Sequence, residues 1–229
     1  NTLIQAADSL KNLIKDRCLV FCVCENSLES IVGYIGLMRG KIVPVLISDT
    51  INKEFMEGLM KAYMPQYIWI PKSKTDSIKS IENCSMVFSY GNYVLLKTSY
   101  SANYSLHEDL SLLLTTSGST GSPKLVRLSY KNINSNTNSI AEYLNISQND
   151  KPITTLPMSY TYGLSIINSH FLKGCAVIVT NKSIMSKAFW DLLKKENATT
   201  FGGVPYTYEM LKKLGFFKMD IPSLKILTQ

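Results

Sequence analysis

The sequence has no long hydrophobic run, and this absence excludes one class of protein. No stretch of about 18 consecutive apolar residues occurs among its 229 residues, so no transmembrane segment is predicted. The N-terminus, which starts at Asn1, has neither the basic residues nor the apolar core of a secretory signal peptide. It also lacks an initiator methionine, which predicts that the chain is processed, truncated or cut from a longer protein. We therefore expect a cytoplasmic location.

Histidine is scarce and no cysteine pair stands out, which argues against a metal centre and against a disulfide framework. His107 and His170 are far apart and show no ligand spacing such as H-x-x-x-H, so we interpret both as ordinary structural residues. The five cysteines are Cys18, Cys22, Cys24, Cys84 and Cys175. Their number is odd, none forms a C-x-x-C pair, and most lie in apolar runs, so we expect reduced and mostly buried thiols.

Positive charge is in only modest excess. Lys plus Arg number 24 and Asp plus Glu number 17, which gives a formal net charge of +7. The basic residues are scattered and do not form the stripe that a nucleic-acid groove needs, so no nucleic-acid partner is expected. A small polyanion such as a nucleotide is compatible with this balance. Hydrophobic residues make up 45% of the chain, a globular composition that suffices for one large domain or two small ones.

Apolar strands and amphipathic helices alternate along the chain. Residues 19–24 form a continuous apolar run typical of a buried strand, and residues 28–35 then repeat apolar side chains at helical spacing up to an expected stop at Gly40. Ser129 is the expected N-cap of a later helix. The alternation predicts an α/β fold with mostly parallel sheets flanked by helices. Further strands are expected at 42–46, 67–70, 86–88, 93–96, 110–114, 153–155, 176–179, 198–201 and 224–229, and further helices at 3–14, 55–63 and 131–144.

The stretch L-L-T-T-S-G-S-T-G-S-P-K, residues 113–124, directly follows an apolar strand. Its glycines let backbone N–H groups turn toward a ligand, its hydroxyls add donors or oxygen ligands for magnesium, and Lys124 supplies a compact positive charge. The pattern is therefore typical of a phosphate-binding loop. It is not a Walker A loop, because Gly118, Gly121 and Lys124 are each three residues apart, and it lacks the G-x-G-x-x-G of dinucleotide-binding folds.

The loop sequence T-S-G-S-T-G-S-P-K resembles the phosphate-binding signature of the adenylate-forming superfamily of AMP-dependent synthetases and ligases, which includes acyl-CoA synthetases. Four other segments resemble that family: residues 34–45, 156–164 (L-P-M-S-Y-T-Y-G-L), 202–205 (G-G-V-P) and 224–229. The resemblance implies part of the large N-terminal domain of an acyl-CoA synthetase-like fold. Residues 1–105 and 106–229, approximately, would be its first and second α/β regions, the second carrying the loop. The family's C-terminal domain would lie beyond this chain.

The resemblance also implies an activity: ATP-dependent conversion of a carboxylic acid to an acyl-adenylate, then transfer of the acyl group to a thiol, with coenzyme A as the expected acceptor. The residues that would hold the β- and γ-phosphates of ATP are Thr116, Ser117, Gly118, Ser119, Thr120, Gly121 and Lys124. Thr116 is also the candidate for a hydroxyl near Mg²⁺. The family's catalytic Lys and its magnesium-binding Glu would lie outside the chain, so we expect the chain alone to be inactive.

The segment 156–164 departs from the family's pattern at one position. Tyr160 stands where the family usually has a histidine, and a tyrosine keeps a donor and a ring but does not become cationic near neutral pH. By the resemblance, Tyr160, Tyr162, Gly163 and Val204 would help to form the pocket for the acyl group. The alternative is that the two tyrosines only pack over the edge of the sheet.

Two functions stay open at the level of sequence. One is the acid–thiol ligase, in which coenzyme A and a carrier-protein thiol are alternative acceptors. The other is a non-catalytic nucleotide- or phosphate-binding module, or an interaction module, on a degenerate ligase fold, which the missing histidine favours. The sequence identifies neither the acid nor the oligomeric state.

Overall fold

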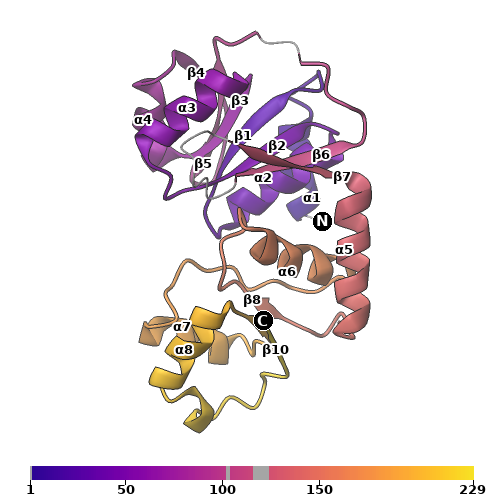
Figure 1. Ribbon diagram of the computed structural model, residues 1–229, viewed down its shortest axis with the longest axis vertical. Coiled ribbons are helices and arrows are strands. Elements are labelled where there is room, and N and C mark those ends of the chain that lie inside the picture. The colour runs from indigo at the N-terminus through magenta and orange to yellow at the C-terminus, as the bar shows by residue number, and fades with distance from the viewer. Residues whose placement is uncertain (1, 102–103, 116–123) are drawn as a thin grey trace. The chain divides into compact units, whose positions relative to one another are not determined.

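The computed structural model describes residues 2–101, 104–115 and 124–229 (Figure 1). The chain forms two compact units, Asn1–Ile133 and Asn134–Gln229, and each is described by itself below. The strands at residues 110–115 and 125–129 belong to the sheet of the first unit. The division near residue 105 that the sequence suggests stays a prediction about the domains of the whole protein.

Within the described residues, the first unit is built on a seven-stranded sheet in the order β4-β5-β3-β1-β2-β6-β7. The strands that pair in parallel form its centre: β1 (Leu19–Cys24), β2 (Val43–Ser48), β3 (Tyr67–Pro71) and β6 (Leu110–Thr115). Antiparallel strands flank them: β5 (Tyr93–Thr98), β4 (Cys84–Tyr90) and β7 (Leu125–Ser129). All residues of β1 are buried, as expected for a strand covered on both faces. The predicted α/β class with mostly parallel sheets is confirmed.

Helices cover both faces of this sheet. They are α1 (Thr2–Lys11), α2 (Leu28–Arg39), α3 (Lys53–Tyr63) and α4 (Thr75–Lys79), with the 3₁₀ turn η1 (Lys72–Lys74) before α4. Successive strand residues point to opposite faces. Phe21 and Val45 therefore belong to the core formed with α3 and α4, whereas Trp69 lies against Gly33 of α2. Helix α2 ends at Gly40, as predicted.

Strands β4 and β5 form an antiparallel hairpin at one edge of the sheet (Figure 1). The sequence predicts short strands here, at 86–88 and 93–96. The structure adds them to the sheet beside β3. Met86 in β4 is 66% exposed, because an edge strand has neighbours on one side only. This exposure explains why the apolar pattern of this segment is weak.

Helix α5 (Tyr130–Tyr143) contains the boundary between the two units. Ser129 caps it as predicted: its Oγ accepts from the N–H of Asn132 at 3.1 Å, and Asn132 Oδ1 accepts from the N–H of Ser129 at 2.9 Å. This reciprocal pair satisfies two backbone donors that the start of a helix leaves without helical partners. The local sequence therefore determines where α5 begins.

The second unit has a smaller sheet, in which three parallel strands occur in the order β10-β9-β8 over the residues that the structure describes. Its elements are β8 (Pro152–Ile153), α6 (Thr161–Leu172), α7 (Lys187–Lys195), β9 (Thr200–Gly202), α8 (Pro205–Lys213), η2 (Phe216–Lys218) and β10 (Ile226–Thr228). Phe201 of β9 packs with Phe189 and Trp190 of α7 in one core. On the opposite face, Gly202 lies against Ile166 of α6. Across the described part of the chain, no helix is long and apolar enough to cross a membrane.

The prediction of a strand at residues 176–179 is wrong. This segment pairs with β8 through a single bridge, Ile153 to Ile178. Beyond the bridge, the side chain of Thr154 replaces backbone pairing. Its Oγ1 donates to the carbonyl of Thr180 at 3.0 Å and accepts from the N–H of Thr180 at 2.8 Å. A side-chain hydroxyl here occupies the positions that a neighbouring backbone would fill in a ladder.

Candidate functional site

The predicted phosphate loop connects two neighbouring strands of the first unit. Thr115 at the end of β6 pairs with Leu125 at the start of β7, so the loop leaves the sheet at the carboxyl end of β6. Because β6 is parallel to β1, β2 and β3, the carboxyl ends of all four strands lie at the same edge, where open α/β sheets bind their ligands. Lys124 is exposed directly before β7. The other predicted phosphate-binding residues, Thr116, Ser117, Gly118, Ser119, Thr120 and Gly121, lie outside the described residues.

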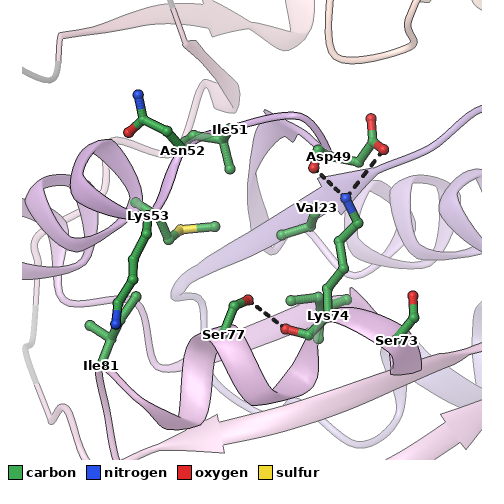
Figure 2. A pocket seen from close by; sticks show the side chains of 11 residues that line it. Val23, Asp49, Ile51, Asn52, Lys53, Ser73, Lys74, Ser77 and Ile81 are labelled. Atoms are coloured by element: carbon green, nitrogen blue, oxygen red, sulfur yellow. Dashed lines mark hydrogen bonds and ion pairs between the residues drawn. The ribbon is translucent and has the colours of Figure 1, made fainter.

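A cavity of about 270 Å³ opens at the same carboxyl edge of the first unit (Figure 2). Its wall includes Asp49 after β2, Lys74 after β3, and Lys53 at the first turn of α3. Lys74 Nζ forms an ion pair with Asp49 Oδ2 at 3.3 Å and also donates to the Asp49 carbonyl, as the dashed lines in Figure 2 show. Lys53 approaches Glu57 at 3.9 Å. The charged groups of this wall thus have partners within the protein, and we assign the cavity no ligand.

Sequence reasoning missed this cavity, although a signal was present. Polar residues follow the apolar runs of β2 and β3 directly, as Asp49 and as Ser73 with Lys74. Parallel strands bring such residues to one edge. Glu25, which follows β1, lies in the same electrostatic environment: burial raises the pKa of its carboxyl group, and the nearby charge of Asp49 adds to this effect.

Three predicted acyl-pocket residues lie at the start of α6 in the second unit. Tyr160 is the N-cap residue and is 47% exposed. Tyr162 donates its hydroxyl proton to Thr228 Oγ1 at 2.7 Å. Gly163 approaches the preceding loop closely, since a Cβ there would lie 2.2 Å from the carbonyl oxygen of Pro157. This glycine is therefore required by the packing of the first turn of α6. The fourth predicted residue, Val204, is the N-cap of α8.

Thr228 of β10 joins the segments that carry these residues. Besides the bond from Tyr162, its carbonyl accepts from the N–H of Gly203 at 2.9 Å and from the hydroxyl of Tyr208 at 2.6 Å. Burial raises the pKa of the Tyr208 phenol to about 12, so this hydroxyl remains a donor at neutral pH. The start of α6, the turn after β9 and the end of β10 are thus held together at one residue.

A cavity of about 410 Å³ lies beside Thr228, between α5, α6, β9 and β10. Its volume is in the range of small-molecule sites. Tyr162 and Thr228 belong to its wall, and Ile166 and His170 continue that wall along α6. Of the four predicted pocket residues, all of which the structure describes, Tyr162 lines this cavity, whereas Tyr160, Gly163 and Val204 are not among its lining residues.

His170 is a buried titratable residue of this wall. Its Nδ1 lies 2.8 Å from the carbonyl of Ile166, so it donates there, and Nε2 accepts from Thr200 Oγ1 at 3.2 Å. Burial lowers the pKa of the imidazole, while the Ile166 carbonyl and the charge of Asp150 act in the opposite direction. His170 therefore links α6 to β9 as a neutral side chain. The sequence predicts a structural role for it but not its place beside a cavity.

Comparison with known proteins identifies the family to which the chain belongs. A model of a family described as AMP-binding enzyme matches residues 5–228. The acyl-CoA synthetase FUM10 of Gibberella moniliformis is 30% identical over 126 residues, which cover 54% of this chain and 22% of the relative. The oxalate–CoA ligase of Saccharomyces cerevisiae is 34% identical over 98 residues, covering 42% and 18%. The structure of ATP-bound MatB from Rhodopseudomonas palustris superposes with a TM-score of 0.76 at 20% identity, covering 99% of this chain and 48% of that one. The matched segments thus cover only about a fifth of the length of these curated relatives.

Proposed function

The chain belongs to the family of AMP-binding enzymes, and from this premise we propose that it forms part of an ATP-dependent ligase. The ligase activates a carboxylic acid as its acyl-adenylate and then passes the acyl group to a thiol, with AMP as the leaving group. Coenzyme A is the proposed thiol, since the relatives FUM10 and oxalate–CoA ligase are named for it. A carrier-protein thiol is the alternative acceptor, as in the aryl-carrier-protein ligase of Bacillus anthracis, which is 30% identical over 115 residues. The cytoplasm remains the proposed location.

One observation carries the proposal beyond family membership. Three of the segments that resemble the family in sequence, 156–164, 202–205 and 224–229, meet at Thr228 through the bonds from Tyr162 and Gly203. They meet beside a cavity large enough for a small molecule. This convergence of segments that lie far apart in the chain supports the proposal of an acyl pocket.

In the proposed reaction, a carboxylate oxygen of the acid attacks the α-phosphorus of ATP, and pyrophosphate leaves. Tyr160, Tyr162, Gly163 and Val204 position the acid, and the ring of Tyr160 is half-exposed. Thr116, Ser117, Gly118, Ser119, Thr120, Gly121 and Lys124 hold the β- and γ-phosphates. Donors aimed at the leaving phosphates lower the barrier because they stabilise the charge that develops there.

Magnesium is the metal ion that ATP chemistry usually requires. Among the described residues, no group of three or more His, Cys, Asp or Glu side chains is placed to hold a metal ion. Thr116 therefore stays the proposed neighbour of Mg²⁺ within this chain, and no step of the proposal depends on further ligands from the described part.

The test is acid-dependent exchange of labelled pyrophosphate into ATP by the full-length protein. We expect exchange with at least one acid from a broad panel. Tyr160→Ala is expected to raise the KM for that acid or to lower kcat, whereas Phe217→Ala, which removes a side chain that is 81% exposed, serves as the control. Unchanged kinetics in Tyr160→Ala would remove Tyr160 from the pocket.

A non-catalytic nucleotide-binding module is the second candidate, and Tyr160 in the place of the family's histidine is the observation that favours it. The two functions give different results in the same assay. A module binds ATP but supports no exchange with any acid of the panel, while the ligase does both.

A further inference from the structure

The cavity beside Thr228 has no charged side chain in its wall. Its lining residues, all of them described, are apolar, aromatic or uncharged polar residues. Ile166 and Leu227 supply apolar surface, and the rings of Tyr143 and Tyr162 add aromatic surface. Neither a lysine nor an arginine is available there to pair with an anionic group of a ligand, and neither an aspartate nor a glutamate is available to pair with an ammonium group.

The polar side chains that α6 adds to the wall already have partners within the protein. Ser165 Oγ donates to the carbonyl of Tyr162 at 2.8 Å, and Ser169 Oγ donates to the carbonyl of Ile166 at 3.2 Å. The imidazole of His170 is engaged at both nitrogens, by Ile166 and by Thr200. Asp150, whose charge acts on His170, accepts from Ser147 and Thr199, which do not belong to the lining.

The lining also indicates how long the bound part of a ligand would be. Tyr162, Ile166 and His170 recur at four-residue spacing, so they form one stripe along α6. At 1.5 Å per residue, this stripe extends for about 12 Å. A ligand that fills the space along it needs a tail of several carbon atoms, which an acid as short as oxalate does not have.

We propose that the cavity holds the tail of a monocarboxylic acid, and that this tail is uncharged, mainly apolar and several carbons long. Dicarboxylic acids and amino-terminated acids of equal length are rejected, because their second charge would enter the cavity without a partner. Burying an unpaired charge costs several kcal/mol, far more than the gain from the added contacts. This inference rests on the proposed function, in which Tyr160 and Tyr162 position the acid, and it takes the reacting carboxylate to lie at the Tyr162 end of the stripe.

The experiment compares three acids of matched length in pyrophosphate exchange by the full-length protein: hexanoate, hexanedioate and 6-aminohexanoate. We expect kcat/KM for hexanoate to exceed that for each charged analogue by on the order of 100-fold. Equal values for hexanoate and either analogue would overturn the inference while leaving the ligase function intact.

A charge placed in the wall gives a second test. Ser165→Lys puts an ammonium group into the cavity and is expected to shift the preference toward hexanedioate by at least about tenfold. Leu172→Lys adds the same charge on the same helix at a residue that is 49% exposed, and it is expected to leave the preference unchanged. An identical shift in both variants would mean that the cavity does not hold the tail.

Direct binding separates this inference from the proposed function. If no acid supports exchange, the ligase function fails, and calorimetric titration of the protein with the same three acids decides the inference alone. Binding of hexanoate in preference to both analogues, lost in Ser165→Lys, would uphold it. Absence of hexanoate binding, or equal binding of all three acids, would refute it.

Discussion

His170 shows what burial does to a single residue. This residue of α6 is 1% exposed, and its two ring nitrogens bond to Ile166 of the same helix and to Thr200 of β9. Burial disfavours the charged imidazolium and lowers the pKa from its ordinary value of 6.5. The unfolded chain therefore binds a proton at a higher pH than the folded chain does.

This difference predicts a pH dependence of stability. As the pH falls from about 7.5 to about 5, the unfolded state takes up the His170 proton before the folded state, so the free energy of unfolding should decrease through the window below the ordinary pKa. In His170→Asn this part of the slope should be absent, whatever the overall loss of stability. Urea unfolding at several pH values measures the slope.

His107→Asn is the matched control, because the side chain of His107 is 76% exposed and its replacement should preserve the slope. Retention of the original slope by His170→Asn would show that His170 does not titrate in this window.

The cysteines also show how burial disfavours the charged form of a side chain. Cys18, Cys22, Cys24 and Cys175 are buried and free, and Cys84 in the edge strand is half-buried. Burial raises the pKa of Cys18 and of Cys24 to about 12. These thiols are therefore protonated at neutral pH, which agrees with the packing role predicted from their apolar surroundings.

At the scale of elements, the first turn of α6 is the most constrained segment near the cavity. Gly163 leaves no room for a side chain, because a Cβ would meet the carbonyl oxygens of Pro157 and Leu156 at 2.2 and 2.9 Å. Both obstacles are backbone atoms, which do not rotate away as the end of a flexible side chain does. The helix and the loop before it must separate to admit a methyl group.

We accordingly expect Gly163→Ala to lower the free energy of unfolding by about 1–3 kcal/mol, although alanine favours helix more than glycine does. Urea unfolding measures the change. Leu172→Ala, at the exposed end of the same helix, should stay within about 0.5 kcal/mol of the parent. If Gly163→Ala is as stable as Leu172→Ala, the close approach at Pro157 does not exist in solution.

At the scale of the whole molecule, each unit has its own hydrophobic core. Phe21 belongs to the core of the first unit with Val45 and Leu59, and Phe201 belongs to that of the second with Phe189 and Trp190. Both phenylalanines are fully buried. The stability of each unit should then depend first on its own core.

Paired truncations test this independence. Phe201→Ala should cost about 3–5 kcal/mol and should speed amide hydrogen exchange in β8 and β9, while β1 and β2 keep their protection. Phe21→Ala should give the reverse pattern. Hydrogen exchange measured strand by strand distinguishes this result from a single cooperative unit, in which either substitution would speed exchange in both sheets.

Local patterns in the sequence were sufficient for the elements and for the family. The apolar run at 19–24 predicts β1, Ser129 predicts the start of α5, and the motif at 113–124 predicts an AMP-binding enzyme. Such features depend on residues within a few positions of one another, so one sequence reveals them. The strand at 176–179 failed because an apolar run alone does not show whether a neighbouring backbone will pair with it.

The cavity, its uncharged wall and the meeting of Tyr162, Gly203 and Thr228 were decided by the tertiary structure alone. These residues are separated by 25 to 66 positions, and no local period relates them. Their contacts arise because the parallel order of β8, β9 and β10 places α6 on one face of the sheet. What the sequence determined by itself was which segments become strands and helices and which chemistry the loop resembles. Which side chains face one another depended on how those segments pack, because packing joins residues across the whole chain.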